Sequence, residues 1–301
     1  MLLITQTALE LGFLYALVAM ALFLSYRILD IADLTTDGCF VLGAAVSVTL
    51  AAAGHPILAI PAAMLAGACA GFITAFLQTR LGVPSILAGI VTNTGLYTVN
   101  LMAMGWKSNR SLLGVDTVFT LLRDAGIGGK FYELLLAAVV TVLAGVLLRL
   151  FLGTRLGLSI RATGDNRDMV RSSSVNPTFT VTVGLCISNA LTGLAGAMVG
   201  QYQKTVDINS GTGIVVIGLA CLIIGETVLG RRTVTKGIIA VIVGSVLYRF
   251  IYAFVSMVIP AECMKLLTAV VVGLAIAAPS LKKWAQFRRR RAAARKEEEV
   301  C

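Results

Sequence analysis

Charged residues are scarce in this chain of 301 residues, at 13% against about 25% in soluble domains. None occurs between Cys39 and Gln78 or between Thr178 and Gln203. Hydrophobic residues make up 57% of the chain, and the mean hydropathy is +0.90. So few charges exclude an ordinary soluble domain. The apolar runs are continuous and about 20 residues long, which disfavours a β-barrel and predicts an all-α polytopic membrane protein.

The residues that usually form metal sites and catalytic clusters are also sparse. The single histidine, His55, stands beside Pro56 at an expected turn, which leaves no base–nucleophile cluster for a membrane enzyme. The six cysteines are scattered without a C-x-x-C pair, so we expect neither a disulfide framework nor a zinc site. We therefore predict no catalytic residues and no metal site in this chain.

A phosphate-binding loop of the G-x-x-x-x-G-K-[ST] type is missing as well. The nearest candidate, Gly128-Gly129-Lys130, is followed by Phe131 and lacks the pattern. A transporter with this sequence must therefore take its energy from elsewhere. We expect it to bind no cofactor itself and to depend on ATP-Mg in a partner subunit.

Long apolar runs are what the sequence does have. They predict nine membrane-spanning helices, at residues 8–26, 36–53, 57–78, 84–104, 131–151, 178–200, 212–229, 237–258 and 264–280. We assign residues 1–281 to one transmembrane permease domain that includes a loop at 153–177, and residues 282–301 to a basic tail.

Positive charge predicts how the helices are oriented. The tail LKKWAQFRRRRAAARKEEEV carries eight Lys and Arg residues and is expected to face the cytoplasm. Counting spans back from it places the loops at 153–177 and 230–236 inside and the N-terminus outside. The loops on the inner side then hold most of the Lys and Arg, although the bias is weak in the N-terminal half.

Two polar sites interrupt the apolar spans. Residues 86–100, ILAGIVTNTGLYTVN, have glycines on both sides of a Thr-Asn-Thr triplet, and a second site lies in the sixth span. Polar groups at membrane depth are tolerated where they face protein or a water-filled cavity. Hydrogen bonding between helices would explain the first site equally well and is the favoured explanation of the second. The candidates for the translocation path are Asn93, Thr94, Tyr97, Asn100 and Asn189.

Small residues also mark expected contacts between helices. Gly67 with Gly71, and Gly196 with Gly200, form two G-x-x-x-G pairs, which we expect to pack within the chain.

Two charges fall within the predicted spans. Glu226 lies near the inner end of its span, and Arg249 is about 20 Å from the inner surface at 1.5 Å per residue. Ionisable groups at this depth are functional candidates. Arg249 is expected to reach toward the interface or to pair with Glu262 or Asp207.

The loop at 153–177 is the most polar part of the chain, with RATGDNRDMVRSSSV at 161–175. We expect Gly164 to break the chain and Asp165 to cap a short helix from Asn166 to about Ser173. Such a helix, held between two spans, suits docking into a groove on a soluble partner. Lying on lipid headgroups is the alternative.

This loop also carries a family resemblance. GLSIRATGDNRDMV, residues 157–170, is similar to the cytoplasmic coupling segment of ABC importer permeases of the branched-chain amino acid and ribose type. Members of that superfamily have Gly-x-x-x-Arg-Ala followed by Gly-x-Asn, matched here by Gly157, Arg161, Ala162, Gly164 and Asn166. Residues 189–226 and the segment KLLTAVVVGLA resemble the same family, so the likeness covers about 10–280. Members commonly have Gly at the position of Ser174 and a small residue at that of Lys204.

The resemblance implies a permease subunit that forms the path for a small solute, with an amino acid as the expected substrate. It is strongest to a permease group whose binding proteins are linked to aromatic amino acids such as tryptophan and tyrosine. The implied partners are cytoplasmic ABC ATPase subunits, an extracytoplasmic substrate-binding (lipo)protein and a second permease chain, expected to be another copy; nucleic acid is not among them. The implied location is the bacterial cytoplasmic membrane. The residues expected to couple to the ATPase are Arg161, Gly164, Asp165, Asn166, Arg167, Met169 and Val170.

An ion-coupled secondary transporter of a small solute is the alternative function. Such a transporter usually needs a carboxylate or a broken-helix ion site near the membrane midplane. The sequence places no carboxylate in the middle of a predicted span, although Asn93 could belong to a sodium site.

Overall fold

The protein is described here from a computed structural model, which covers residues 2–126, 129–230, 233–257, 270 and 273. The chain divides into two units, residues 1–250 and 251–301. The first unit contains the strands, the cavities and the helices discussed below, apart from the last residues of α11, which lie beyond residue 250. The basic tail at 282–301 and nearly all of the predicted span at 264–280 lie outside the described residues.

Each of the first eight predicted spans corresponds to a helix. The long helices are α1 (Leu2–Leu22), which continues into a π-helical turn η1 (Phe23–Ile28), α2 (Thr36–Ala52), α3 (Pro56–Thr79), α4 (Ser85–Ala103), α6 (Tyr132–Gly153), α9 (Pro177–Gln203), α10 (Ile214–Leu229) and α11 (Val234–Val255). The short elements are α5 (Val118–Asp124), η2 (Gly129–Phe131), α7 (Arg155–Asp165), α8 (Arg167–Ser172), β1 (Asn109–Ser111) and β2 (Thr205–Asp207).

Six of the described helices are long and apolar enough to cross a membrane: α1 with η1, α3, α4, α6, α9 and α11. Two shorter apolar helices, α2 and α10, lie among them. A multi-pass, all-α membrane protein is therefore confirmed. The total of nine spans and their direction remain predictions.

Helix α9 packs against α1, α2 and α3, and small residues allow the close approach. A methyl group at Gly43 would overlap the carbonyl of Gly193, and one at Gly67 would overlap the carbonyl of Asn189. Gly196 touches the backbone of Phe40 in the same way. Both G-x-x-x-G pairs pack within the chain, as predicted, because lipid offers no hydrophobic drive and close backbone contact must supply the attraction.

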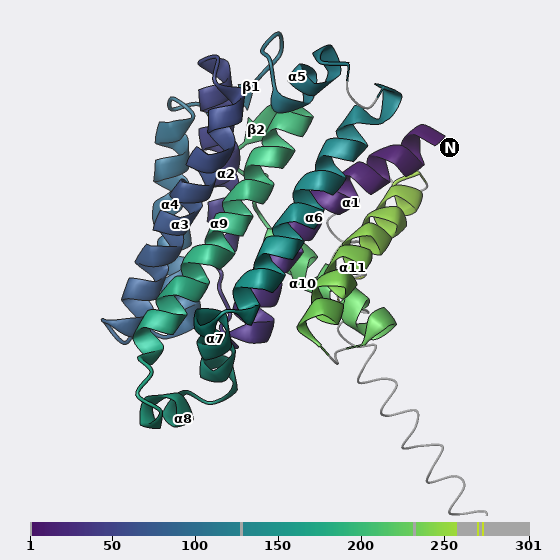
Figure 1. The fold of residues 1–301 in the computed structure, drawn as a ribbon. Coiled ribbons are helices and arrows are strands. Elements are labelled where there is room, and N and C mark those ends of the chain that lie inside the picture. Colours follow the sequence, from purple (N-terminus) through teal and green to yellow (C-terminus); the bar gives the residue numbers. More distant parts are fainter. Residues whose placement is uncertain (1, 127–128, 231–232, 258–269, 271–272, 274–301) are drawn as a thin grey trace, which may run out of the picture. The chain divides into compact units, whose positions relative to one another are not determined.

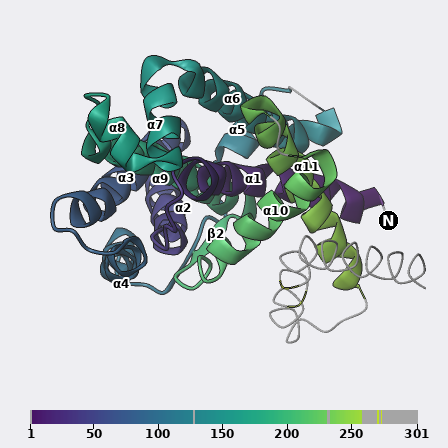
Figure 2. The same cartoon turned by 90° about the horizontal axis from the view of Figure 1, so that it is seen from below.

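Polar and irregular segments lie at the two ends of this helical unit (Figure 1). Helices α7 and α8 lie at one end, and α5 with the strands β1 and β2 lies at the other. Viewed from the α7–α8 end, α4 lies at the edge of the unit, beyond α2 and α3 (Figure 2). His55 is exposed in the turn between α2 and α3, which confirms it as a loop residue.

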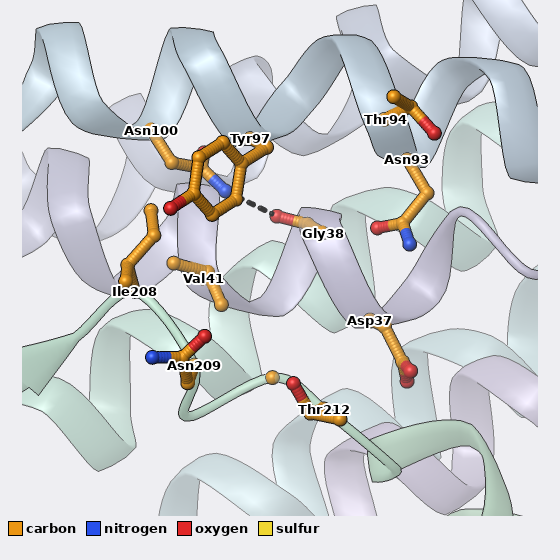
Figure 3. A pocket seen from close by; sticks show the side chains of 11 residues that line it. Asp37, Gly38, Val41, Asn93, Thr94, Tyr97, Asn100, Ile208, Asn209 and Thr212 are labelled. Carbon is orange, nitrogen blue, oxygen red and sulfur yellow. Dashed lines mark hydrogen bonds between the residues drawn. The ribbon is translucent and has the colours of Figure 1, made fainter.

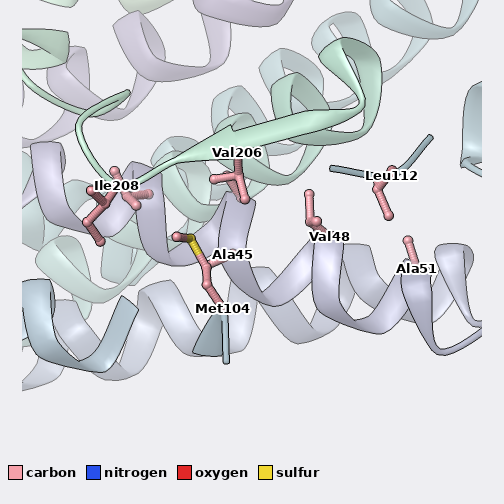
Figure 4. Close-up of a cluster of buried hydrophobic side chains, with 9 residues drawn as sticks. Ala45, Val48, Ala51, Met104, Leu112, Val206 and Ile208 are labelled. Atoms are coloured by element: carbon pink, nitrogen blue, oxygen red, sulfur yellow. The ribbon is translucent and has the colours of Figure 1, made fainter. Parts of the chain in front are cut away.

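The strands form a small antiparallel pair in which Arg110 is opposite Val206. Val206 and Ile208 are buried against α2, in a cluster with Val48 and Met104 (Figure 4). Full burial of an aliphatic side chain contributes about 1.5–3 kcal/mol. This cluster therefore fixes the start of the loop that joins β2 to α10, and that loop forms one wall of the cavity described next.

Candidate functional site

A cavity of about 340 Å³ lies between α2, α4 and the loop before α10. The side chains of α4 point toward α2 and the loop across this space (Figure 3). The lining residues are Asp37, Gly38, Val41, Asn93, Thr94, Tyr97, Asn100, Ile208, Asn209, Gly211 and Thr212. The volume lies in the range of small-molecule sites, about 300–1,000 Å³.

Four of the five predicted path residues line this cavity. They are Asn93, Thr94, Tyr97 and Asn100. Asn93, Tyr97 and Asn100 are spaced four and three residues apart, so they share one face of α4, and Thr94 follows Asn93 directly. Gly38 lets α4 come close, because a methyl group there would overlap the side-chain oxygen of Asn93.

Asn100 is the most deeply buried polar side chain of the cavity, with 2% of its surface exposed. Its Nδ2 donates to the carbonyl oxygen of Gly38 at 3.1 Å. Its Oδ1 is buried and accepts no hydrogen bond from the described residues. A buried acceptor without a donor is costly, and the described residues supply no donor for this oxygen.

Asp37 is the one charged residue among those that line the cavity. Its carboxylate accepts hydrogen bonds from two backbone amides at the start of α10, Gly213 N at 3.1 Å and Val215 N at 2.8 Å. It therefore caps α10, whose N-terminus carries partial positive charge. The sequence alone did not point to Asp37 as a site residue.

Asn189, the fifth predicted path residue, lies elsewhere. It is fully buried in α9, and its Nδ2 donates to Asp33 Oδ2 at 2.7 Å and to the carbonyl of Leu185 at 3.1 Å. Gly71 of α3 packs against it. Hydrogen bonding between segments, the alternative weighed from sequence, describes Asn189.

The coupling segment is built differently from the sequence expectation. Residues 155–165 form the helix α7, and Gly164 lies inside it rather than breaking the chain. A methyl group at Gly164 would overlap the carbonyl oxygen of Ile28 at the end of η1. Thr163 bonds Thr180 of α9 across 2.8 Å, and Ile160 is fully buried. Helix α7 is thus attached to α9 and to η1, the continuation of α1.

The cap of the short helix is Asn166, not Asp165 as expected. Its side chain accepts from the backbone amides of Asp168 at 3.0 Å and Met169 at 3.1 Å, and α8 follows at Arg167–Ser172. Asp165 is the last residue of α7.

Met169 and Val170, both expected to couple to the ATPase, differ in exposure. Val170 is buried, whereas 67% of Met169 is exposed. Arg161, Arg167 and Asp165 are also exposed. Helix α8 therefore anchors through Val170 and leaves an apolar side chain among charges on its outer face.

Ser174 and Lys204, the two residues that depart from the family pattern, both have a left-handed backbone conformation. Ser174 has φ 59° and Lys204 has φ 54°. A side chain in this region costs about 1–2 kcal/mol, which glycine avoids. The glycine common at the position of Ser174 therefore has a conformational reason.

A second cavity, of about 290 Å³, lies at the α7–α8 end and connects two sets of predicted residues. Arg161 and Asp165 of α7 line it together with Glu226, whose Oε1 pairs with Arg27 Nε of η1 at 3.1 Å. The π-helical turn that carries Arg27 is a geometry frequent at functional sites. The structure thus links Glu226 to the coupling segment.

Arg249 lies over an aromatic ring that the sequence alone did not indicate. Its guanidinium carbon lies 3.6 Å from the centre of the Tyr15 ring, and both side chains are buried. Glu262 lies outside the described residues. A desolvated cation–π contact of this kind is worth about 2 kcal/mol.

A multi-pass helical unit with a polar cavity and an anchored polar segment at one end has the architecture of a membrane permease. The chain belongs to the family described as branched-chain amino acid transport system / permease component, whose profile matches residues 4–278. It is therefore a permease subunit of an ABC-type amino-acid transport system, and a transport subunit rather than an enzyme.

Two relatives cover nearly the whole chain. A tyrosine transport system permease protein of Clostridioides difficile (strain R20291) is 34% identical over 259 residues, 85% of each chain. An uncharacterized protein of Rickettsia prowazekii (strain Madrid E) is 32% identical over 283 residues, 92% of this chain and 97% of the relative. No solved structure matches this chain.

Proposed function

We propose that this permease imports an amino acid with a large apolar or aromatic side chain, and that the substrate passes through the cavity between α2 and α4. The observation that carries the proposal is the convergence of Asn93, Tyr97, Asn100 and Asp37 on one cavity of about 340 Å³. Apolar walls from Val41 and Ile208 and the half-exposed ring of Tyr97 suit such a side chain. The tyrosine transport permease among the relatives supports an aromatic substrate.

In this scheme, the ATPase subunits act on the permease through α8. Cytoplasmic ATPases bind the exposed face around Met169, and α7 transmits their movement because it is fixed to α1 and α9. ATP-Mg stays in those subunits, and this chain binds no cofactor of its own. The transport cycle requires that substrate and nucleotide favour different openings of the cavity.

The remaining parts of the assembly follow from the same scheme. A second copy of the chain covers part of the apolar surface of the unit, and an extracytoplasmic binding protein delivers substrate at the end that carries β1 and β2. The α7–α8 end faces the cytoplasm, nine spans cross the bacterial cytoplasmic membrane, and the N-terminus lies outside.

Reconstitution tests the proposal. The chain is placed in proteoliposomes with its ATPase and binding protein, and uptake of radiolabelled L-tyrosine, L-leucine and D-ribose is measured with and without ATP. We expect ATP-dependent uptake of an amino acid and none of ribose. Uptake of ribose alone, or equal uptake without ATP under an ion gradient, would refute the proposal.

A further inference from the structure

Helix α10 reaches from the cavity between α2 and α4 to the second cavity at the α7–α8 end. The loop before its first residue, at 208–212, forms a wall of the first cavity, and Glu226 in its last turn lines the second. Its 16 residues, at 1.5 Å each, give a length of about 24 Å. One helix therefore joins the cavity proposed for the substrate to the end that carries the coupling segment.

The first turn of α10 is fastened to α2. Both carboxylate oxygens of Asp37 accept backbone amides there, Oδ2 from Gly213 at 3.1 Å and Oδ1 from Val215 at 2.8 Å. Gly213 directly follows the loop at 208–212. The position of α10 therefore determines where this wall of the cavity ends.

The last turn of α10 is fastened to η1 by the only charged residue in the sequence of this helix, Glu226. Its side chain is 4% exposed, and its Oε1 lies 3.1 Å from Nε of Arg27, whose side chain is 43% exposed. A carboxylate buried this deeply in an apolar helix is costly without a cationic partner. The ion pair thus fixes the end of α10 to η1.

The coupling segment packs against the same turn of η1. Ile28 follows Arg27 directly, and its carbonyl oxygen leaves no room for a side chain at Gly164 of α7. Arg161 and Asp165, one helical turn apart on α7, line the cavity that contains Glu226. A shift of α7 therefore acts on both partners of the ion pair, on Arg27 through the backbone of η1 and on Glu226 through the charges of the cavity.

We infer that Glu226 is a positioning residue for transport: its ion pair with Arg27 fixes α10 to the coupling segment, so that movement of this segment reaches the wall of the cavity at 208–212. Glu226 does not touch the substrate in this role. The inference rests on the proposed function and adds the route by which the ATPase subunits act on the cavity. Continuity in space does not by itself establish coupling, so both ends of α10 have to be measured.

The first measurement follows the cavity wall. Thr212, which projects from the loop (Figure 3), is replaced by cysteine (Thr212→Cys) in a chain without native cysteines. The chain is placed in nanodiscs with its ATPase subunits, and the rate of modification by a small thiol reagent is measured with and without a nonhydrolysable ATP analogue. Coupling between two sites typically amounts to a roughly 5- to 150-fold effect. We expect the analogue to change the rate by such a factor when Glu226 is present, and hardly at all with Glu226→Gln.

The second measurement is the number of ATP molecules hydrolysed per amino acid imported by the complete complex in proteoliposomes. Glu226→Gln should leave ATP hydrolysis in place and raise this number, because the ATPase still cycles while the cavity wall no longer follows. An ion pair that only stabilises the fold would lower hydrolysis and uptake together and leave the number unchanged.

Three further variants separate coupling from structure. Glu133→Gln is the matched control, because it removes the same charge from α6, outside the lining of both cavities, and should change neither measurement. Arg27→Gln removes the more exposed partner and should reproduce the effects of Glu226→Gln; it also serves as the test if Glu226→Gln gives no folded protein. Arg27→Lys keeps the positive charge and should retain more of the coupling than Arg27→Gln.

Four results would overturn the inference: no effect of the analogue at residue 212 in the parent chain, wild-type behaviour of folded Glu226→Gln and Arg27→Gln proteins in both measurements, the same changes in Glu133→Gln, or equal losses in Arg27→Lys and Arg27→Gln. Any of these, combined with normal ATP-driven uptake by the wild-type complex, would leave the proposed function standing. Absence of ATP-dependent amino-acid uptake by the wild-type complex would instead refute the proposed function.

Discussion

Replacing Gly164 by alanine should loosen the coupling segment from the membrane helices. A methyl group at this position would overlap the backbone carbonyl of Ile28, and a backbone atom cannot move aside as a flexible side chain can. Overpacking of this kind costs about 1–3 kcal/mol. Alanine favours a helix over glycine by about 1 kcal/mol, which offsets only part of that cost.

Gly153→Ala is the matched control, because Gly153 also lies in a helix and a methyl group there meets no other atom within 4 Å. We expect thermal unfolding of the Gly164→Ala protein at a lower temperature than the control. ATP-driven uptake should fall as well, since α7 connects α8 to α1 and α9. A Gly164→Ala protein that is as stable and as active as the Gly153→Ala protein would refute the packing argument.

Three other substitutions follow from the same structure. Ser174→Gly should raise the free energy of unfolding by about 1 kcal/mol, because the backbone of Ser174 is left-handed at φ 59°. Denaturant unfolding measures this free energy, and a lower value for the glycine variant would contradict the reasoning. Tyr15→Leu should lower the free energy of unfolding by about 2 kcal/mol, because the contact with Arg249 is lost. Tyr15→Phe keeps an aromatic ring and should lower it far less. Equal losses in the two variants would argue against a cation–π contact. Met169→Ser should reduce co-purification of the ATPase and ATP-driven uptake without reducing the yield of folded permease, since 67% of Met169 is exposed; unchanged co-purification would count against docking at α8.

The sequence predicted one wall of the cavity and missed the other. The polar residues of α4 stand out because they interrupt an apolar run with a spacing of three or four residues. Asp37 and the loop at 208–212 join them only through the packing of α2, β2 and α10, which no local pattern contains. The sequence feature that could have indicated Asp37 is its place as a single aspartate at the start of a long apolar run.

The coupling segment shows the same limit at a single residue. Gly-Asp in a polar stretch favours a turn, so the sequence predicted a break at Gly164. The glycine is instead required by the approach of Ile28, more than a hundred positions earlier in the chain. The residues around a glycine indicate whether the backbone can turn there. They do not indicate whether a carbonyl from a distant part of the chain packs against it, because that depends on the whole fold.

Chemical labelling of the cavity is the most direct test that substrate passes between α2 and α4. Tyr97→Cys is introduced into a variant without native cysteines, and uptake is measured after treatment with a small thiol reagent. We predict that modification blocks ATP-driven uptake and that substrate protects against it, whereas modification of Ala53→Cys, exposed in the turn after α2, has no effect. Full uptake after complete modification at residue 97 would contradict the account.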